Sequence, residues 1–211
     1  MKGLLIKDFT LYFRIYGKIA PFLVLIFSLL GLATPGFSAS ICALLPFYAL
    51  FLPASEVGSR WNFYACALPI SRAKQVASRF LFVFLILLSA FAVSLVSGLL
   101  PMFRTDIRIL EVLASSLGCA LFILPLLGLA LTLDYKFGPG KSRMLISLLC
   151  LLPLGLLFVA DYLNFGPVLQ SSLHWIDIHL AVTVVCFVLF CLLSYLFFLL
   201  VSIRIYKKQD F

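Results

Sequence analysis

Long stretches without charge alternate with short charged segments along most of the chain. A membrane-spanning helix needs about 20 consecutive apolar residues. A charged side chain at mid-membrane costs roughly 2.5–3.5 kcal/mol on an insertion scale, so the uncharged windows show where spans can lie. These windows predict four spanning helices near residues 80–103, 112–133, 144–162 and 180–203.

One further uncharged window, residues 19–55, is too long for a single helix. Near its middle, Thr34 precedes Pro35-Gly36, a dipeptide that marks turns. We therefore expect two short spans, near 19–34 and 37–54, joined by a tight outer turn. The pattern as a whole predicts an all-α membrane protein in which residues 1–211 form a single domain with six transmembrane helices.

Composition supports a membrane location. Hydrophobic residues make up 64% of the chain and charged residues 11%, whereas a soluble domain has about 45–50% apolar and about 25% charged residues. The net charge of +8 then points to an anionic membrane face rather than to nucleic acid. The six cysteines lack a CxxC pair and are expected to pack as small apolar residues. The first residues lack a cleavage site typical of a removable signal peptide.

The distribution of basic residues predicts the orientation. Cytoplasmic loops of membrane proteins carry most Lys and Arg. With six spans and a cytoplasmic N-terminus, fourteen of the sixteen basic residues lie on the inner side, and only Arg104 and Arg108 lie outside. Both termini are therefore expected in the cytoplasm.

The N-terminal segment, residues 1–18, is too charged to span. Lys7, Arg14 and Lys18 can share one helical face, while aromatic residues including Phe9 and Tyr12 gather on another. Such a helix is suited to lie in the membrane interface. An ordinary basic anchor before the first span is an equally open interpretation.

Residues 55–79 are too polar to span yet contain several aromatic side chains. Pro69 should end one short helix, because proline disfavours helical geometry in the residue before it. Ser71 can cap the next helix, which is expected to run through Arg79 into the third span. Apolar groups on a cytosolic projection indicate a docking surface. Aromatic residues resting on lipid headgroups are the alternative.

The same loop resembles the first cytoplasmic loop of bacterial type-2 ABC exporter permeases. The residues that carry the resemblance are Glu56, Trp61, Tyr64, Leu68, Pro69, Ile70, Ser71, Arg72, Val76 and Arg79. The start of the chain, Met1 to Phe9, and its end, Arg204 to Phe211, are also similar to that family. The spans themselves carry little motif to compare.

The resemblance implies a division of labour between chains. In that family the first inner loop is a coupling helix that docks on a separate cytosolic ABC ATPase, and the N-terminal helix is an interfacial elbow helix. ATP and Mg would be bound by that partner, with no cofactor on this chain. The docking residues implied by the resemblance are Glu56, Arg60, Trp61, Tyr64, Leu68, Pro69 and Arg72. A second permease copy, identical or homologous, would complete the pathway in the bacterial cytoplasmic membrane.

Two other motifs suggest chemistry only weakly. The segment 137–142, Phe-Gly-Pro-Gly-Lys-Ser, lacks the first glycine of a phosphate loop and the strand that precedes one, so it is interpreted as a tight cytoplasmic turn. His174, Asp177 and His179 lie close together on the outer side, but three ligand types without a fourth are a weak metal signal. No metal site is predicted.

The preferred expectation is a transport subunit that moves an amphipathic or hydrophobic cargo such as a peptide, drug or lipid-like molecule, because the predicted spans are nearly uncharged. The alternative is a non-transporting membrane anchor or sensor that docks a cytosolic signalling protein on its basic loops. An intramembrane enzyme is disfavoured because such enzymes place polar catalytic groups at depth. The chain is therefore not expected to be an enzyme.

Overall fold

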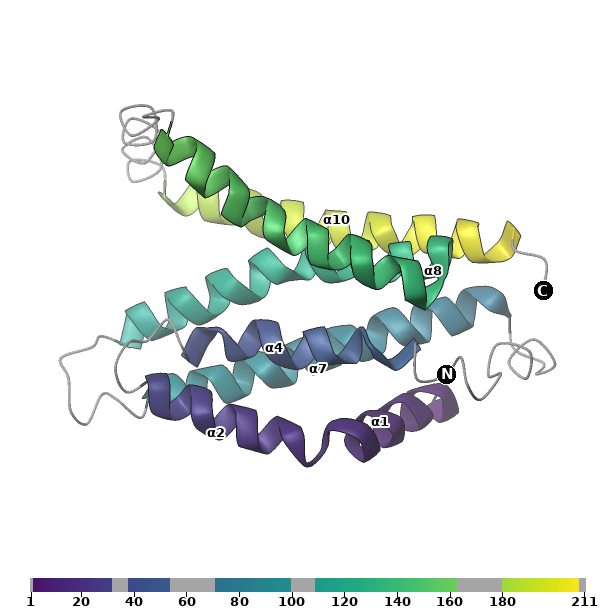
Figure 1. Ribbon diagram of the computed structural model, residues 1–211, viewed down its shortest axis with the longest axis horizontal. Helices are drawn as coiled ribbons and strands as arrows, with labels where there is room; N and C mark the ends of the chain where they lie inside the picture. Colours follow the sequence, from purple (N-terminus) through teal and green to yellow (C-terminus); the bar gives the residue numbers. More distant parts are fainter. Residues whose placement is uncertain (1, 32–37, 54–70, 100–108, 163–179, 209–211) are drawn as a thin grey trace.

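A computed structural model describes most of the chain as helix (Figure 1). The described residues are 2–31, 38–53, 71–99, 109–162 and 180–208. Side chains are described for only part of 139–162. Within these ranges every regular element is an α-helix, which confirms the predicted all-α class for the described part of the chain.

The helices follow one another as α1, α2, α4, α7, α8 and α10 (Figure 1). Their bounds are α1 Lys2–Tyr16, α2 Ile19–Gly31, α4 Ile41–Ala49, α7 Arg72–Leu99, α8 Ile109–Tyr162 and α10 Leu180–Lys208.

Three helical segments are long and apolar enough to cross a membrane: α7, the first arm of α8 (Ile109–Gly138) and Val184–Lys208 of α10. At 1.5 Å per residue, the 28 residues of α7 extend about 42 Å. The hydrocarbon core of a bilayer is about 30 Å thick. Helix α7 therefore has enough length to cross the bilayer and to project beyond it.

For the two predicted spans nearest the N-terminus, the described residues end at Gly31 for the first and cover 38–53 for the second. Helix α2 has 13 residues and α4 has 9, against the predicted ranges 19–34 and 37–54. The predicted turn at Thr34-Pro35-Gly36 lies outside the described residues. Helices α1 and α2 meet at a bend of 67° and could together count as one broken span, giving up to four candidates. The count of six spans stays a prediction.

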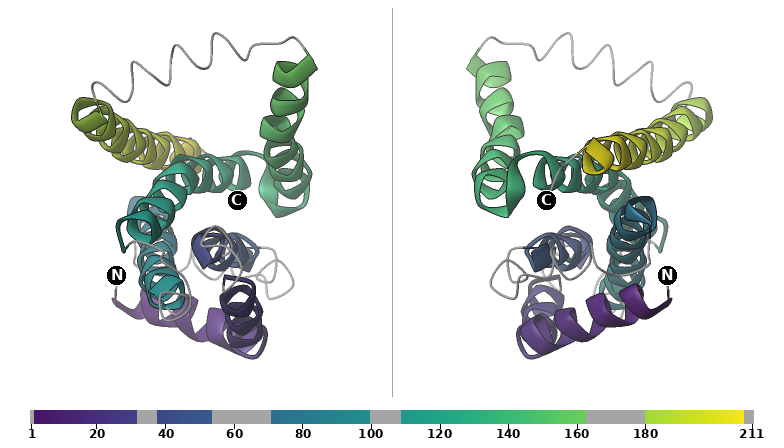
Figure 2. Two further views of the ribbon diagram at one scale, coloured as in Figure 1. Left: turned by 90° about the vertical axis from the view of Figure 1, so that its left-hand side faces the viewer. Right: turned by 90° about the vertical axis from the view of Figure 1, so that its right-hand side faces the viewer.

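Helix α8 contains a sharp break at Gly138, where φ is +77° and ψ is 162°. Beyond the break the chain turns back, so the two arms of α8 form a hairpin (Figures 1 and 2). Only glycine adopts such a conformation readily. The break lies inside the predicted turn, and the second arm is helical throughout the predicted span 144–162.

Helix α7 packs against every other described helix, that is α1, α2, α4, α8 and α10. Its side chains Val76, Phe80, Phe82 and Val83 are fully buried. They form one apolar cluster with residues of α1, α4, α8 and α10. A displacement of α7 would therefore change its contacts with every other described helix.

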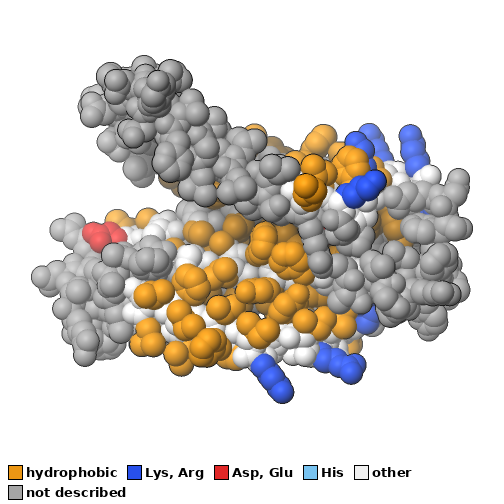
Figure 3. Space-filling view, viewed as in Figure 1, with side chains coloured by type: hydrophobic (Ala, Val, Ile, Leu, Met, Phe, Trp, Pro, Cys, Tyr) orange, Lys and Arg blue, Asp and Glu red, His pale blue; other side chains and the backbone are white. Residues whose placement is uncertain are grey.

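The surface separates apolar and basic residues. A broad apolar area covers the flank of the bundle, and Lys and Arg side chains gather mainly toward one end and along its lower edge (Figure 3). We call the end that contains Arg72, Gly138 and Lys208 the basic end; both chain termini lie toward it (Figure 1). The predicted orientation, with most basic segments on the cytoplasmic face, stays a prediction.

Candidate functional site

Three helices meet at the basic end: the start of α7, the break of α8 and the last turn of α10. Nη1 of Arg72 donates a hydrogen bond to the carbonyl oxygen of Lys207 over 3.3 Å. The Tyr206 hydroxyl donates to Oε1 of Gln75 over 3.1 Å. The Tyr206 ring also packs edge-on against Tyr135, with 5.3 Å between ring centroids. The first turn of α7 is thereby connected to α10, and α10 to α8.

This junction includes one of the seven docking residues that the resemblance implies. Arg72 is the first residue of α7. Glu56, Arg60, Trp61, Tyr64, Leu68 and Pro69 lie outside the described residues. The predicted start of the next helix is correct, because the Ser71 carbonyl accepts from the backbone amides of Lys74 and Gln75 at 2.9 and 3.3 Å. Helix α7 then runs through Arg79 without interruption, as predicted.

Helix α1 is attached to the same part of α7 by buried charges. Asp8 of α1 is 2% exposed and Arg79 of α7 is 8% exposed. Oδ2 of Asp8 lies 3.8 Å from Nε of Arg79, and Oδ1 lies 3.1 Å from Nζ of Lys7. A buried carboxylate is stable only when cations or donors compensate for the lost water.

Aromatic contacts surround this ion pair. The ring of Phe9 meets Phe82 of α7 edge-on, with centroids 5.0 Å apart. The Tyr12 hydroxyl donates to the carbonyl oxygen of Leu45, which lies in α4, over 3.2 Å. The predicted aromatic face of α1 is thus packed inward, except that Phe13 is 63% exposed.

Sequence reasoning assigned no role to Asp8. A local signal was present: Leu5, Asp8, Phe9 and Tyr12 are three or four residues apart and so share one helix face. A lone acid on an otherwise apolar face needs a basic partner. Arg79 could not be identified as that partner from spacing, because it belongs to another helix far along the chain.

A line of small polar groups joins α8 to α10. The Thr132 hydroxyl donates to the carbonyl oxygens of Gly128 and Phe198, at 2.8 and 3.3 Å. The Ser202 hydroxyl donates to Oγ1 of Thr132 over 2.9 Å. Near the Gly138 break, the Ser142 hydroxyl donates to Oδ1 of Asp134 and so links the two arms of α8.

Small residues pack the opposite end of the bundle. The Ser94 hydroxyl of α7 donates to the carbonyl oxygen of Ser38 over 2.9 Å. A Cβ added at Gly98 would overlap Cγ1 of Val112 and lie 3.1 Å from Oγ of Ser38. This close approach fixes α7 against the start of α8.

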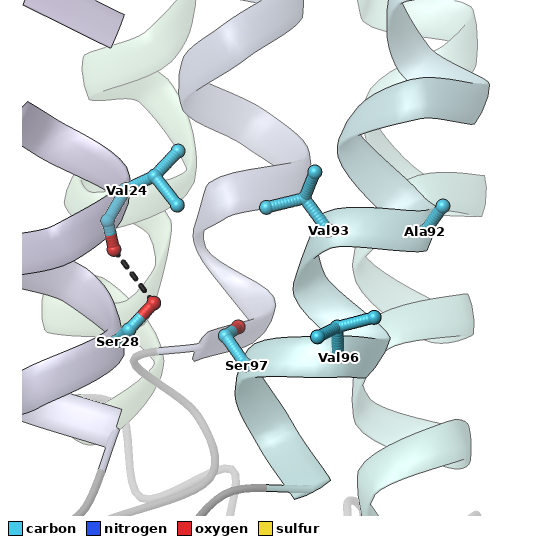
Figure 4. A pocket seen from close by; sticks show the side chains of 6 residues that line it. All are labelled: Val24, Ser28, Ala92, Val93, Val96 and Ser97. Atoms are coloured by element: carbon cyan, nitrogen blue, oxygen red, sulfur yellow. Dashed lines mark hydrogen bonds between the residues drawn. The ribbon is translucent and has the colours of Figure 1, made fainter. Parts of the chain in front are cut away.

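A cavity of about 310 Å³ opens between α2 and α7 (Figure 4). The two serine hydroxyls that line it form hydrogen bonds within their own helices. The Ser28 hydroxyl donates to the carbonyl oxygen of Val24 over 2.7 Å, and the Ser97 hydroxyl donates to the carbonyl oxygen of Ser94 over 3.0 Å. The cavity therefore suits an apolar chain and offers no reactive group. Its lining residues are Val24, Ser28, Ala92, Val93, Val96 and Ser97.

At the basic end the described residues join three helices through hydrogen bonds and a ring contact. Among all the described residues, no cluster of three or more His, Cys, Asp or Glu could hold a metal. His174, Asp177 and His179 lie outside the described residues.

Comparison with known proteins gives a family. Residues 3–207 match the sequence profile of the ABC-2 family transporter protein. No curated protein and no solved structure matches the chain.

Proposed function

The chain belongs to the ABC-2 transporter family, and from this premise we propose that it is the permease subunit of an ATP-driven exporter. It would work with a separate cytosolic ATPase, which binds ATP and Mg. The 55–79 loop would be the coupling element, with the basic end of the bundle facing the cytoplasm. Membership of the family makes the chain a multi-pass membrane protein and a transport subunit rather than an enzyme.

The observation that best supports this proposal is the position and length of α7. The helix begins directly after the proposed docking loop and continues for 28 residues. Its first turn contacts α10 through Arg72 and Gln75, and its next turn lies beside Asp8 of α1 through Arg79. A push on the loop would therefore tilt or shift a rigid helix at the centre of the fold, as rigid-body switching requires.

We propose that two permease chains, identical or homologous, enclose the transport pathway in the bacterial cytoplasmic membrane. An amphipathic or hydrophobic cargo is favoured because the described surface outside the basic end is dominated by apolar side chains (Figure 3). A strongly charged solute would find few compensating groups there.

The test is ATP-dependent transport by the reconstituted complex. The chain is co-expressed with candidate ABC ATPases, purified, and placed in vesicles whose ATPase side faces outward. Uptake of a fluorescent amphipathic peptide or lipid-like dye is followed with ATP and with a non-hydrolysable analogue. A non-transporting anchor would bind a cytosolic protein but show no ATP-dependent uptake with any cargo of this class.

The docking site is tested in the same preparation. Trp61→Ala combined with Leu68→Ala should release the ATPase from the purified complex, because it removes the largest apolar groups of the proposed contact. The matched control is Phe122→Ala with Leu113→Ala, which removes exposed apolar side chains from α8. An ATPase that stays bound to the loop variant contradicts the proposed docking residues.

A further inference from the structure

One face of α10 changes from apolar to basic along its length. Leu193, Phe197 and Leu200 are 65%, 61% and 58% exposed. Continuing in steps of three or four residues, the same face carries Arg204 and Lys207, which are also exposed. Lys208 lies at the edge of this face. We call these six residues the α10 stripe.

The opposite face of α10 is the one that packs into the fold. Cys191, Tyr195, Ser202 and Tyr206 are buried, and the Tyr195 hydroxyl donates to the carbonyl oxygen of Phe80 over 2.8 Å. These contacts fix the rotation of α10 about its axis. The stripe is therefore held on the outside of the bundle.

The dimensions of the stripe match one leaflet of a bilayer. From Leu193 to Arg204 the helix rises about 16 Å at 1.5 Å per residue. Half of the hydrocarbon core is about 15 Å. An acyl chain lying along the leucine and phenylalanine side chains would place its headgroup beside the three cations.

The α8 turn adds positive charge at the same end. Lys136 and Lys141 are exposed, and Nζ of Lys136 lies 5.1 Å from the centroid of the Phe137 ring. The negative charge of Asp134 does not offset these two positive charges at the surface, because its carboxylate is half-buried and accepts a hydrogen bond from the Ser142 hydroxyl. Figure 3 shows Lys and Arg side chains beside apolar ones where α8 turns and α10 ends.

We propose that the α10 stripe, together with Lys136 and Lys141, binds an anionic phospholipid. Clusters of four to eight basic residues next to a spanning helix attract anionic headgroups. A cytosolic protein cannot reach the apolar half of the stripe within the membrane. A second copy packed symmetrically through this face would bring the same cations together, which is unfavourable. The inference concerns lipid binding and does not depend on the transport proposal.

The experiment measures lipids retained by the full-length chain purified in mild detergent. The protein is mixed with phosphatidylglycerol, which is anionic, or with phosphatidylcholine, which is zwitterionic, and bound lipids are counted by native mass spectrometry. We expect the wild-type chain to retain phosphatidylglycerol in clear preference. The variant Arg204→Gln/Lys207→Gln/Lys208→Gln should bind it about tenfold more weakly or worse, because each cation contributes separately.

A matched control removes three exposed cations elsewhere: Lys2→Gln, Arg14→Gln and Lys18→Gln on and beside α1. This variant should keep most of the phosphatidylglycerol. If both variants lose the same amount of bound phosphatidylglycerol, the lipid is attracted by diffuse positive charge and not by a site on α10. Equal retention of phosphatidylglycerol and phosphatidylcholine by the wild-type chain would also overturn the proposal. If the α10 variant keeps its lipid but loses a co-purified ATPase, the surface belongs to the protein partner.

Folding is checked separately by size-exclusion elution and by the melting temperature without added lipid. If the triple variant fails to fold, Lys207→Gln is compared with Lys207→Arg, which keeps the charge. Lipid binding that falls with the glutamine and returns with the arginine supports the proposal. The same loss with both substitutions contradicts it.

Discussion

Oδ2 of Asp8 lies 3.8 Å from Nε of Arg79, and both side chains are buried between α1 and α7. This pair joins the N-terminal helix to the segment that follows the proposed docking loop. The movement of α7 in a transport cycle would therefore carry α1 with it. The energetic contribution of the ion pair can be measured from the stability of variants at these two positions.

Asp8→Leu should destabilise the protein strongly, because it leaves the Arg79 guanidinium buried without this carboxylate. Breaking a buried ion pair typically costs about 3–5 kcal/mol. The double variant Asp8→Leu/Arg79→Met should recover much of that loss, since it removes both charges from the apolar site. Melting temperatures in detergent give the comparison. A double variant that is less stable than Asp8→Leu would mean that the two residues do not stabilise each other.

Gly98→Ala should lower the melting temperature, because the added methyl group overlaps Val112 where α7 meets α8. Overpacking of this kind typically costs about 1–3 kcal/mol. Gly118→Ala is the matched control, as a Cβ there would meet nothing within 4 Å. That variant should be neutral or slightly stabilising, since alanine favours helix over glycine. Equal stability of the two variants would contradict the close approach at Gly98.

Gly138→Ala should disturb the hairpin of α8. With φ at +77° and ψ at 162°, an alanine at this position is strained by about 1–3 kcal/mol. No neighbour within 4 Å opposes the added methyl group, so the effect isolates backbone conformation. Stability and the ATPase activity of the complex are measured beside Gly3→Ala, whose added Cβ also meets nothing within 4 Å. If Gly138→Ala changes neither the stability nor the ATPase activity, the result would argue against the break at this residue.

Tyr206→Phe and Tyr206→Ala separate two contacts of the α7–α8–α10 junction. The phenylalanine variant loses the hydrogen bond to Gln75 but keeps a ring against Tyr135. A single hydrogen bond of this type contributes about 0.5–1.5 kcal/mol. The alanine variant also loses ring packing and should be clearly less stable. If both variants lose the same stability, the ring contact contributes nothing.

Much of the helical plan could be predicted from charge spacing alone. Three uncharged windows coincide largely with α7, the first arm of α8 and α10, which are the helical segments long and apolar enough to span, because a charge inside a span is costly wherever it occurs. Pro69 and Ser71 gave the start of α7 within one residue. Each of these features depends on local chemistry, which a sequence displays directly.

The lengths of the helices within the 19–55 window could not be predicted from the absence of charge. An uncharged sequence permits a helix but does not specify where it ends, and α4 stops at Ala49 after 9 residues. The Asp8–Arg79 pair and the approach of Gly98 to Val112 were also beyond sequence reasoning. Both depend on which helices become neighbours, and no spacing within a single helix encodes that.

The burial of Asp8 beside Arg79 has a consequence for biosynthesis. Asp8 and Arg79 are 71 positions apart, so at ribosomal speeds of about 5–20 residues per second the acid emerges roughly 4–14 s before the arginine. Until then the nascent chain has no Arg79 to receive this carboxylate in an apolar setting. Helix α1 therefore cannot complete its contact with α7 until Arg79 has been translated.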